Sequence, residues 1–177
     1  MVQDNPDPDD IELLRRAAAG DSAAFHALVD RHAQRLYRIA VGLTGNATDA
    51  EDVLQETFIG AFRGLKGFEG RASVKTWLTR ILFMQSAQWR RGRRRKPAQR
   101  LDEAAAAPLG SAEATLDVEA AIEQLSPEHQ QVLLLREYDR MSYDEIAEVL
   151  EVPRGTVESR LHRARSELRD RLKAYLP

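Results

Sequence analysis

Apolar residues recur every three or four positions along most of the chain, and this spacing restricts the protein to packed helices. Leu36, Ile39 and Leu43, for example, fall on one face of an α-helix. No stretch alternates apolar and polar residues for long enough to predict a β-strand. Only 6% of the residues are aromatic, so the core should be mainly aliphatic. The sequence therefore predicts an all-α protein.

Turn and capping signals set the helix ends in the first part of the chain. Gly20 and Gly45 end helices, and Asp21 is the predicted N-cap of the helix that follows the first of these breaks. Thr48 and Glu51 have the spacing of a capping box. These signals predict several short and medium helices in succession, the first of them at residues 10–19.

A compositional change divides the chain into two small helical domains. Residues 97–118 are rich in alanine and acidic residues and contain few large apolar side chains, which predicts a flexible acidic linker. The linker separates a first domain at residues 1–96 from a second at residues 119–177. In the second domain, Ser142 and Glu145 form another capping box.

The chain lacks the residue patterns that are typical of enzyme active sites and metal sites. The chain has no cysteine, which excludes disulfides, thiolate zinc sites and cysteine nucleophiles. The four histidines lack the spacing of metal ligands, and there is no glycine-rich phosphate loop or nucleophile elbow. We therefore expect no catalytic residue, metal site, cofactor or enzymatic activity. Residues 1–10 do not resemble a secretory signal, and no apolar run approaches the roughly 18 residues of a membrane span, so we expect a soluble cytoplasmic protein without membrane insertion.

The net charge of −2 conceals an uneven distribution of charge. Residues 71–101 contain 10 basic residues and no acidic one, and residues 151–173 contain 7 basic and 4 acidic residues. Residues 1–60 contain 11 acidic and 5 basic residues. Two basic segments in an acidic chain indicate two separate contacts with nucleic acid. Attraction between the acidic first domain and the basic last helix would mask DNA contacts in the free protein, and salt would weaken it.

Residues 142–165 have the pattern of a helix-turn-helix, in which the exposed face of the second helix enters the major groove of DNA. Arginine can form two hydrogen bonds with guanine, and glutamate can accept one from the amino group of cytosine. An amphipathic helix with ordinary i,i+4 salt bridges would explain the same charges. The candidate DNA contacts on the second helix are Arg154, Thr156, Glu158, Ser159, Arg160, His162 and Arg163.

A dense basic run at residues 89–96 follows an amphipathic helix that carries Trp77. Aromatic rings beside cations suit unpaired bases, because each stacked base contributes about 1–3 kcal/mol while the cations hold the backbone. Packing in the core is an equally good interpretation of Trp77. An exposed basic tail that binds any polyanion would explain the arginines.

The predicted helix at residues 48–64 has acidic residues in its first half, and Phe58 and Phe62 are expected on its buried side. Acidic residues near a helix N-terminus offset the helix dipole by about 0.3–1 kcal/mol each. They would also form a docking face for a protein, because they repel phosphate. The candidate docking residues are Asp49, Glu51, Asp52, Gln55 and Glu56.

Taken together, these segments closely resemble the extracytoplasmic-function sigma factors of bacteria. The resemblance is carried by residues 49–58, 68–78, 125–128, 143–147 and 155–165, and it spans about residues 11–172. It implies that the first domain docks on the clamp helices of the largest RNA polymerase subunit and captures the −10 promoter element as unpaired DNA. It implies that the second domain reads the −35 element as duplex.

The resemblance also implies which residues and partners are involved. The implied −10 contacts are Arg71, Ser73, Lys75, Thr76, Trp77, Arg80, Trp89, Arg90 and Arg91. The implied partners are core RNA polymerase, through its clamp helices and flap region, promoter DNA, and an anti-sigma factor. Glu158 departs from the basic residue that relatives often carry, so we expect a cytosine opposite it in the −35 element.

Other classes of protein remain open on the sequence alone. A stand-alone helix-turn-helix transcriptional regulator would bind intact duplex DNA without polymerase. A general polyanion-binding protein with a structural role would need only the arginine run. The docking-helix motif and the arginine-rich helix speak against the regulator, and the absence of catalytic motifs speaks against a nucleic-acid hydrolase.

Overall fold

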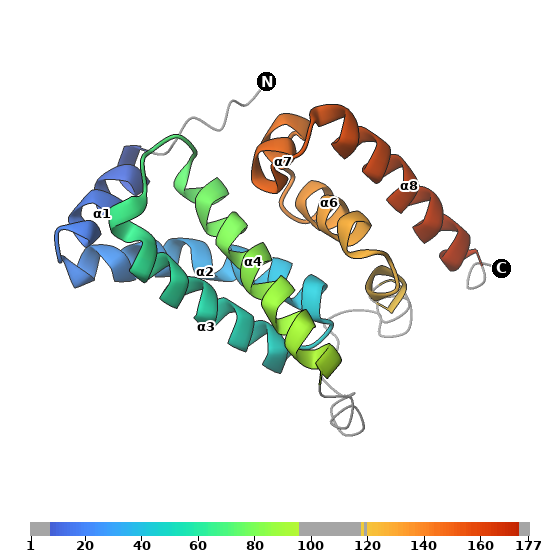
Figure 1. The fold of residues 1–177 in the computed structure, drawn as a ribbon, viewed down its shortest axis with the longest axis horizontal. Helices are drawn as coiled ribbons and strands as arrows, with labels where there is room; N and C mark the ends of the chain where they lie inside the picture. The colour runs from blue at the N-terminus through green and yellow to red at the C-terminus, as the bar shows by residue number, and fades with distance from the viewer. Residues whose placement is uncertain (1–7, 96–117, 119, 174–177) are drawn as a thin grey trace.

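The computed structural model describes residues 8–95, 118 and 120–173 (Figure 1). The helices are α1 (Pro8–Ala18), α2 (Ser22–Thr44), α3 (Ala47–Gly64), α4 (Val74–Arg95), α6 (Pro127–Glu137), α7 (Tyr143–Leu150) and α8 (Arg154–Leu172), with a short 3₁₀ helix, η1 (Leu65–Gly67). The described residues contain no β-strand, so the prediction of an all-α fold is confirmed. The predicted linker at residues 97–118 lies outside the described residues except for Val118.

Side-chain caps explain most of the helix ends in the first block. Asp21 caps α2 by accepting a hydrogen bond from the Ala24 amide, as predicted. Gly45 ends α2 with φ of 77°, a left-handed conformation that glycine adopts without strain. The predicted capping box of Thr48 and Glu51 is wrong. Asn46 caps α3 instead, because the helix begins two residues earlier than the predicted box.

The first block packs α1 to α4 around an aliphatic core. Leu36, Ile39 and Leu82 are almost fully buried at its centre. A polar contact joins α1 to α2, where the His32 ring and the Asp10 carboxylate lie 2.8 Å apart with both side chains less than 10% exposed. Burial lowers the pKa of His32, although Asp10 opposes this shift. The interaction holds the first helix against the bundle.

The second block packs α6, α7 and α8 around Leu135, Ile146 and Leu161. Ser142 and Glu145 form the predicted capping box at the start of α7. Before α6, Ala121, Ile122 and Leu125 are buried, whereas Ala120 is exposed.

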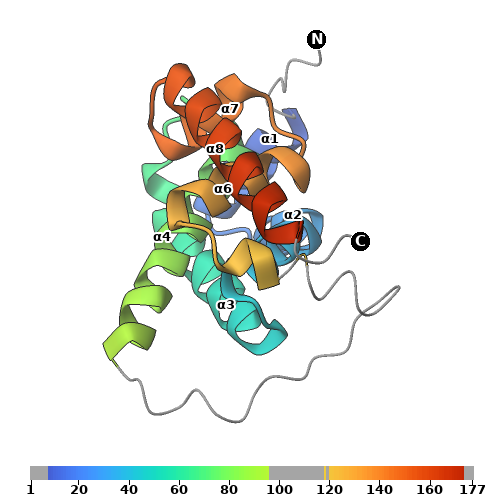
Figure 2. The same cartoon turned by 90° about the vertical axis from the view of Figure 1, so that its right-hand side faces the viewer.

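The two blocks adjoin along one seam, where α6 contacts α2 and α7 contacts α4 (Figures 1 and 2). The hypothesis that the basic last helix covers the acidic first domain is wrong. α8 packs mainly against α6 and α7 and lies on the side of the molecule that faces the viewer in Figure 2. Within the described ranges, no helix has the length and apolar character needed to cross a membrane.

Candidate functional site

The second block has the geometry of a helix-turn-helix. We call the solvent-exposed side of α8, which carries the predicted DNA contacts, the reading face. Val157, Leu161 and Ala164 turn one side of α8 into the core. The opposite side is open to solvent and carries most of the predicted contacts. Of these, Arg154, Glu158, Ser159, His162 and Arg163 are exposed, and Thr156 and Arg160 are half-buried. The sequence therefore predicted the exposed face of this helix correctly.

At the start of α8, two carboxylates hold Arg154. Its guanidinium donates to Asp144 of α7 at 2.8 Å and to Glu158 of α8 at 3.1 Å. Glu158 and then Asp144 raise the pKa of Arg154. Tyr143 adds a cation–π contact, with its ring centroid 5.9 Å from the guanidinium carbon. Arg154 and Glu158 are consequently one bonded pair, of the i,i+4 kind that an amphipathic helix allows. The contacts of Arg154 with Asp144 and Tyr143 had no sequence signal.

The predicted −10 residues divide into exposed and structural groups. Arg71 and Arg91 are exposed, with Arg71 paired to Glu69 on the loop before α4. Ser73 accepts from the Thr76 amide at 3.0 Å and caps α4, while Thr76 is only 3% exposed. The Thr76 side chain is therefore shielded from solvent at the start of α4, and its role as a DNA contact stays a prediction.

The two tryptophans are more buried within the first block than side chains that stack on DNA bases are expected to be. Trp77 is half-buried against Phe68, with ring centroids 5.2 Å apart. Trp89 is also half-buried and donates from Nε1 to Asp49 at 3.0 Å. The alternative of core packing for Trp77 therefore describes its surroundings well.

Two of the predicted −10 arginines are engaged across the seam. Arg80 donates to the Glu148 carbonyl at 2.6 Å. Arg90 donates to the Gln130 side chain at 3.0 Å. The Lys75 carbonyl accepts from Arg35 within the first block. No sequence signal indicated that Arg80 and Arg90 would have protein partners.

The acidic face of α3 is exposed except at its first residue. Glu51, Asp52, Gln55 and Glu56 face solvent. Asp49, in contrast, has a side chain only 18% exposed and pairs with Arg93 of α4, so it fastens α3 to α4 and is not part of the open face. With Asn46 as the N-cap, Asp49 is the third residue of the helix, and Trp89 and Arg93 of α4 bind its carboxylate.

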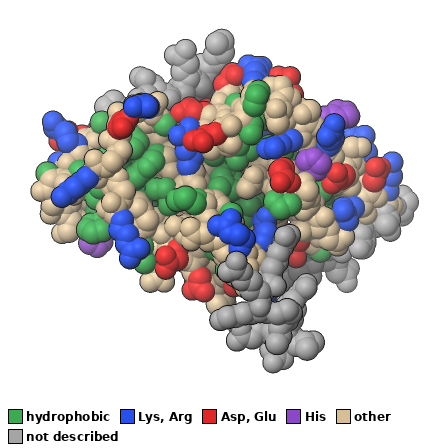
Figure 3. Space-filling model, in the orientation of Figure 1, with side chains coloured by type: hydrophobic (Ala, Val, Ile, Leu, Met, Phe, Trp, Pro, Cys, Tyr) green, Lys and Arg blue, Asp and Glu red, His purple; other side chains and the backbone are tan. Residues whose placement is uncertain are grey.

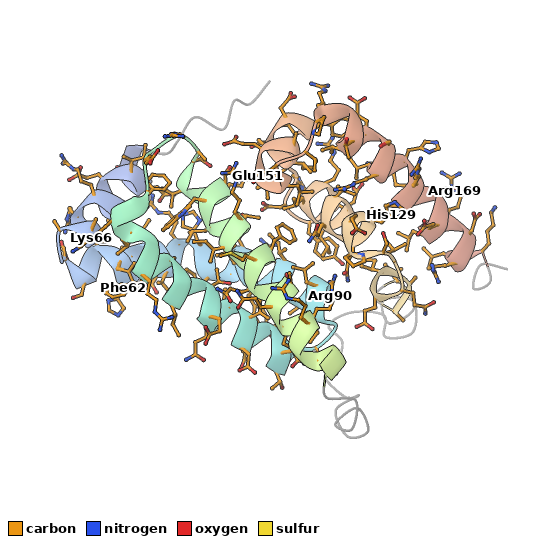
Figure 4. The ribbon with its side chains drawn as sticks, viewed as in Figure 1. Phe62, Lys66, Arg90, His129, Glu151 and Arg169 are labelled. Atoms are coloured by element: carbon orange, nitrogen blue, oxygen red, sulfur yellow. The ribbon has the colours of Figure 1, made fainter. Side chains whose placement is uncertain are left out.

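An apolar patch continues the acidic face toward the end of α3. Phe62, which was predicted to be buried, is 56% exposed and projects from the helix in Figure 4. Its ring lies edge-on to Phe25, with centroids 5.1 Å apart. Phe58, Ile59 and Gln55 complete a shallow pocket around it. The i,i+4 spacing of Phe58 and Phe62 fits either a core or a surface stripe, and it did not distinguish them.

Two protein families match the chain, one on each helical block. The sigma-70 region 2 family matches residues 28–96, and the sigma-70 region 4 family matches residues 115–168. The match to region 4 covers all of α6 and α7 and most of α8.

Whole-chain relatives carry the same description. The chain is 39% identical to the ECF RNA polymerase sigma factor SigE of Mycolicibacterium smegmatis over 88% of its length, and spans 65% of that protein. It is 30% identical to the ECF RNA polymerase sigma factor SigW of Bacillus subtilis, covering 90% of this chain and 95% of that protein.

Two solved structures resemble the fold. CnrH in complex with the cytosolic domain of CnrY has a TM-score of 0.73 at 29% identity, covering 94% of this chain and 98% of that chain. The sigma factor RpoE in complex with the anti-sigma factor NepR from Bartonella quintana has a TM-score of 0.69 at 26% identity. The match covers 84% of this chain and 96% of that chain.

Proposed function

The chain belongs to the extracytoplasmic-function sigma factors of the sigma-70 family, and from this premise we propose that it binds core RNA polymerase and selects the promoters at which transcription starts. The observation that carries the proposal is the pairing of an exposed helix-turn-helix reading face on α8 with an exposed acidic face on α3 in one chain. The protein supplies recognition and the polymerase supplies the chemistry, so the chain has no catalytic role of its own. We place its action in the bacterial cytoplasm, where the chromosome is transcribed.

In this proposal the first block, residues 1–96, captures the −10 element. Arg71 on the loop before α4 and Arg91 near the end of α4 are exposed and would hold the phosphates of the unpaired strand. Ser73 positions the start of α4, which sets the direction of the loop. Residues 97–118 connect this block to the −35-reading block at residues 119–177.

The proposed docking surface on polymerase is the exposed stripe of α3. Asp52, Gln55 and Glu56 form its polar half, and Phe62 with Ile59 forms its apolar half. Such a surface fits a partner helix that presents basic residues beside an apolar one, because both charge and shape are complementary. We propose that this partner is the clamp-helix pair of the largest polymerase subunit.

One solved relative was captured with the anti-sigma factor NepR and another with the cytosolic domain of CnrY, and we propose an anti-sigma partner for this chain as well. An anti-sigma factor would compete with polymerase for the same chain. The apparent affinity of the anti-sigma factor for this chain should fall when core polymerase is in excess, and a competition pull-down measures this fall.

Co-elution with bacterial core RNA polymerase is the direct test of the proposed function. The purified chain should co-elute with core polymerase on size-exclusion chromatography at moderate salt. The complex should then start transcription from a genomic promoter pool at sites that core polymerase alone does not use. Tight binding of duplex DNA without any binding to core polymerase would instead establish a stand-alone helix-turn-helix regulator.

Phe62 offers a prediction about docking, because its side chain contributes little to the core. We expect Phe62→Ser to leave the free energy of unfolding within about 0.5 kcal/mol of wild type and to weaken binding to core polymerase about tenfold, since the apolar half of the surface is lost. Titration of labelled protein with core polymerase measures this. Phe83→Ser, at a buried aromatic residue, should instead destabilise the fold. Unchanged polymerase affinity in Phe62→Ser would remove the apolar patch from the interface.

Glu158 offers a prediction about −35 specificity. We propose that its carboxylate both accepts from a cytosine amino group and holds Arg154 in position. Glu158→Ala should therefore relax preference at one or two adjacent base pairs, each by about 1–3 kcal/mol, without loss of binding to unrelated duplex. Selection of bound sequences from a randomised duplex by the polymerase complex measures this. Asp170→Ala removes the same charge from the exposed far end of α8 and should leave preference unchanged, whereas a uniform loss of affinity in Glu158→Ala would contradict the assignment.

A further inference from the structure

Arg154, the first residue of α8, is held by side chains from both helices of the helix-turn-helix. Its Nη1 donates to Asp144 of α7 at 2.8 Å, and its Nε donates to Glu158 of α8 at 3.1 Å. The ring of Tyr143 lies 5.9 Å from the Arg154 guanidinium carbon and 5.3 Å from that of Arg136 on α6. An acid and an aromatic ring of α7 are thus brought against the start of the reading helix.

The first turn of α7 fixes the position of Asp144. Ser142 and Glu145 form the capping box of this turn, and Ile146 anchors it in the core. The Asp144 side chain itself is 71% exposed, and that of Arg154 is 56% exposed. Such an open ion pair contributes little to folding, because water screens it. Its consequence is therefore expected in binding and not in stability.

Two carboxylates around one guanidinium change what Arg154 can bind. The carboxylates outnumber the cation, so this corner of the reading face repels phosphate. Figure 3 shows acidic side chains among the basic ones over α8. Within the described residues, no acceptor is bonded to Nη2 of Arg154, so the end of the guanidinium can still donate two parallel hydrogen bonds. Guanine offers two neutral acceptors, O6 and N7, for this pair of donors.

From this geometry we propose that Asp144 is a specificity-determining residue for the −35 element, which acts by positioning Arg154 and makes no base contact of its own. Together with Glu158 it holds Arg154 away from the phosphates and directs its unbonded end toward a guanine. The inference rests on the proposed function, which assigns the reading face to the −35 element. It extends that function, because it places a determinant of base preference on α7, outside the reading helix.

Removal of the Asp144 carboxylate should change two properties of DNA binding in opposite directions. The preference for guanine at one base pair should fall, because the guanidinium loses the support that directs it. The affinity for unrelated duplex should rise, because Arg154 becomes able to turn toward a phosphate and one repelling charge is lost. A merely structural role of Asp144 would lower preference and affinity together.

The test compares Asp144→Asn with Glu148→Gln, which removes the same charge from another exposed position of α7. The full chain is bound to core polymerase, and bound sequences are selected from duplexes randomised across the −35 element. Fluorescence anisotropy of the chain alone measures its affinity for an unrelated duplex. Arg154→Ala, with and without Asp144→Asn, completes a double-mutant cycle, which measures whether Asp144 acts through Arg154. Circular dichroism confirms that each variant is folded.

We expect Asp144→Asn to lower the preference for guanine at one base pair about tenfold and to raise affinity for unrelated duplex about threefold. Glu148→Gln should keep the wild-type preference, and Asp144→Asn should change no preference once Arg154 is alanine. An unchanged preference in Asp144→Asn would overturn the proposal, as would an equal loss in the Arg154→Ala background or an equal rise in affinity in Glu148→Gln.

Co-elution with core polymerase is a separate readout. If the wild-type chain does not co-elute, the same selection is made with the chain alone. A shift in preference there would keep the role of Asp144 and remove the sigma function, whereas co-elution without any shift in preference would do the reverse.

Discussion

A variant that carries Asp52→Lys and Glu56→Lys is expected to lose co-elution with core RNA polymerase completely at moderate salt. Both side chains are exposed on the same face of α3, one turn apart. If they face basic residues of the clamp helices, each reversal replaces an attraction with a repulsion. Loss of a close interfacial charge pair commonly costs 2–5 kcal/mol, and 1.4 kcal/mol is a factor of ten. The affinity should fall at least about a hundredfold.

The fold of this variant should be unaffected, which makes the result interpretable. Within the described residues, no hydrogen bond or ion pair joins Asp52 or Glu56 to another side chain, and the helix cap of α3 depends on Asn46. The matched control carries Glu12→Lys and Asp30→Lys, two exposed acids of α1 and α2, and changes the net charge by the same amount. The control should co-elute normally. Equal loss in both variants would mean that net charge alone drives association, and the docking face would have to be abandoned.

The fold could be predicted from the sequence because its signals are local. Leu36, Ile39 and Leu43 lie on one buried stripe as their spacing required, and Asp21 and the capping box of Ser142 act as expected. The helix-turn-helix followed for the same reason. A cap and a period of 3.6 residues are decided within one or two turns of chain, so they are visible without any knowledge of tertiary packing.

The errors at α3 show where local signals fail. Thr48 and Asn46 are both acceptable N-caps, and the choice between them depends on how α3 enters the bundle. With Asn46 as the cap, Asp49 is the third residue of the helix, where Trp89 and Arg93 from the end of α4 reach it. Those two residues lie 40 or more positions away in the chain. A charged residue in an acidic cluster was thus interpreted as surface when tertiary contacts make it a fastening point.

The sequence predicted which residue types form the candidate site, but it did not predict which of their side chains lack protein partners and can contact DNA. Arg80 and Arg90 belong to a basic helix in any interpretation of the sequence. Their partners, the Glu148 carbonyl and the Gln130 amide, lie on the other side of the linker, and one of them is a backbone atom that has no sequence signature. Which cations are free to bind DNA is decided by the packing of the two blocks.

The division into two blocks leads to a second large effect, at Ile146 of α7. This side chain is fully buried in the second block, and truncation of a buried isoleucine to alanine costs about 2–5 kcal/mol. A domain of this size has a core that seldom supplies more than about 3–5 kcal/mol. We expect Ile146→Ala to unfold α6 to α8 at room temperature and to leave α1 to α4 folded, because α1 to α4 pack mainly with one another around Leu36 and Leu82. The buried residues of the two blocks nevertheless form one continuous apolar cluster, so the experiment also tests whether the blocks unfold independently.

Three measurements separate this outcome from general destabilisation. Circular dichroism should show a partial loss of helix, duplex DNA binding should fall to the non-specific level, and co-elution with core polymerase should persist, although weakened by loss of any contact from the second block. Glu148→Ala, at an exposed position on the same helix, keeps the carbonyl that Arg80 uses and should match wild type. If Ile146→Ala instead unfolded the entire chain in one transition, contacts across the seam would be coupling the two cores into a single cooperative unit. These contacts include the ion pair of Arg35 with Asp139 and the hydrogen bond from Gln130 to the Gly42 carbonyl. In that case the two blocks could not separate without unfolding.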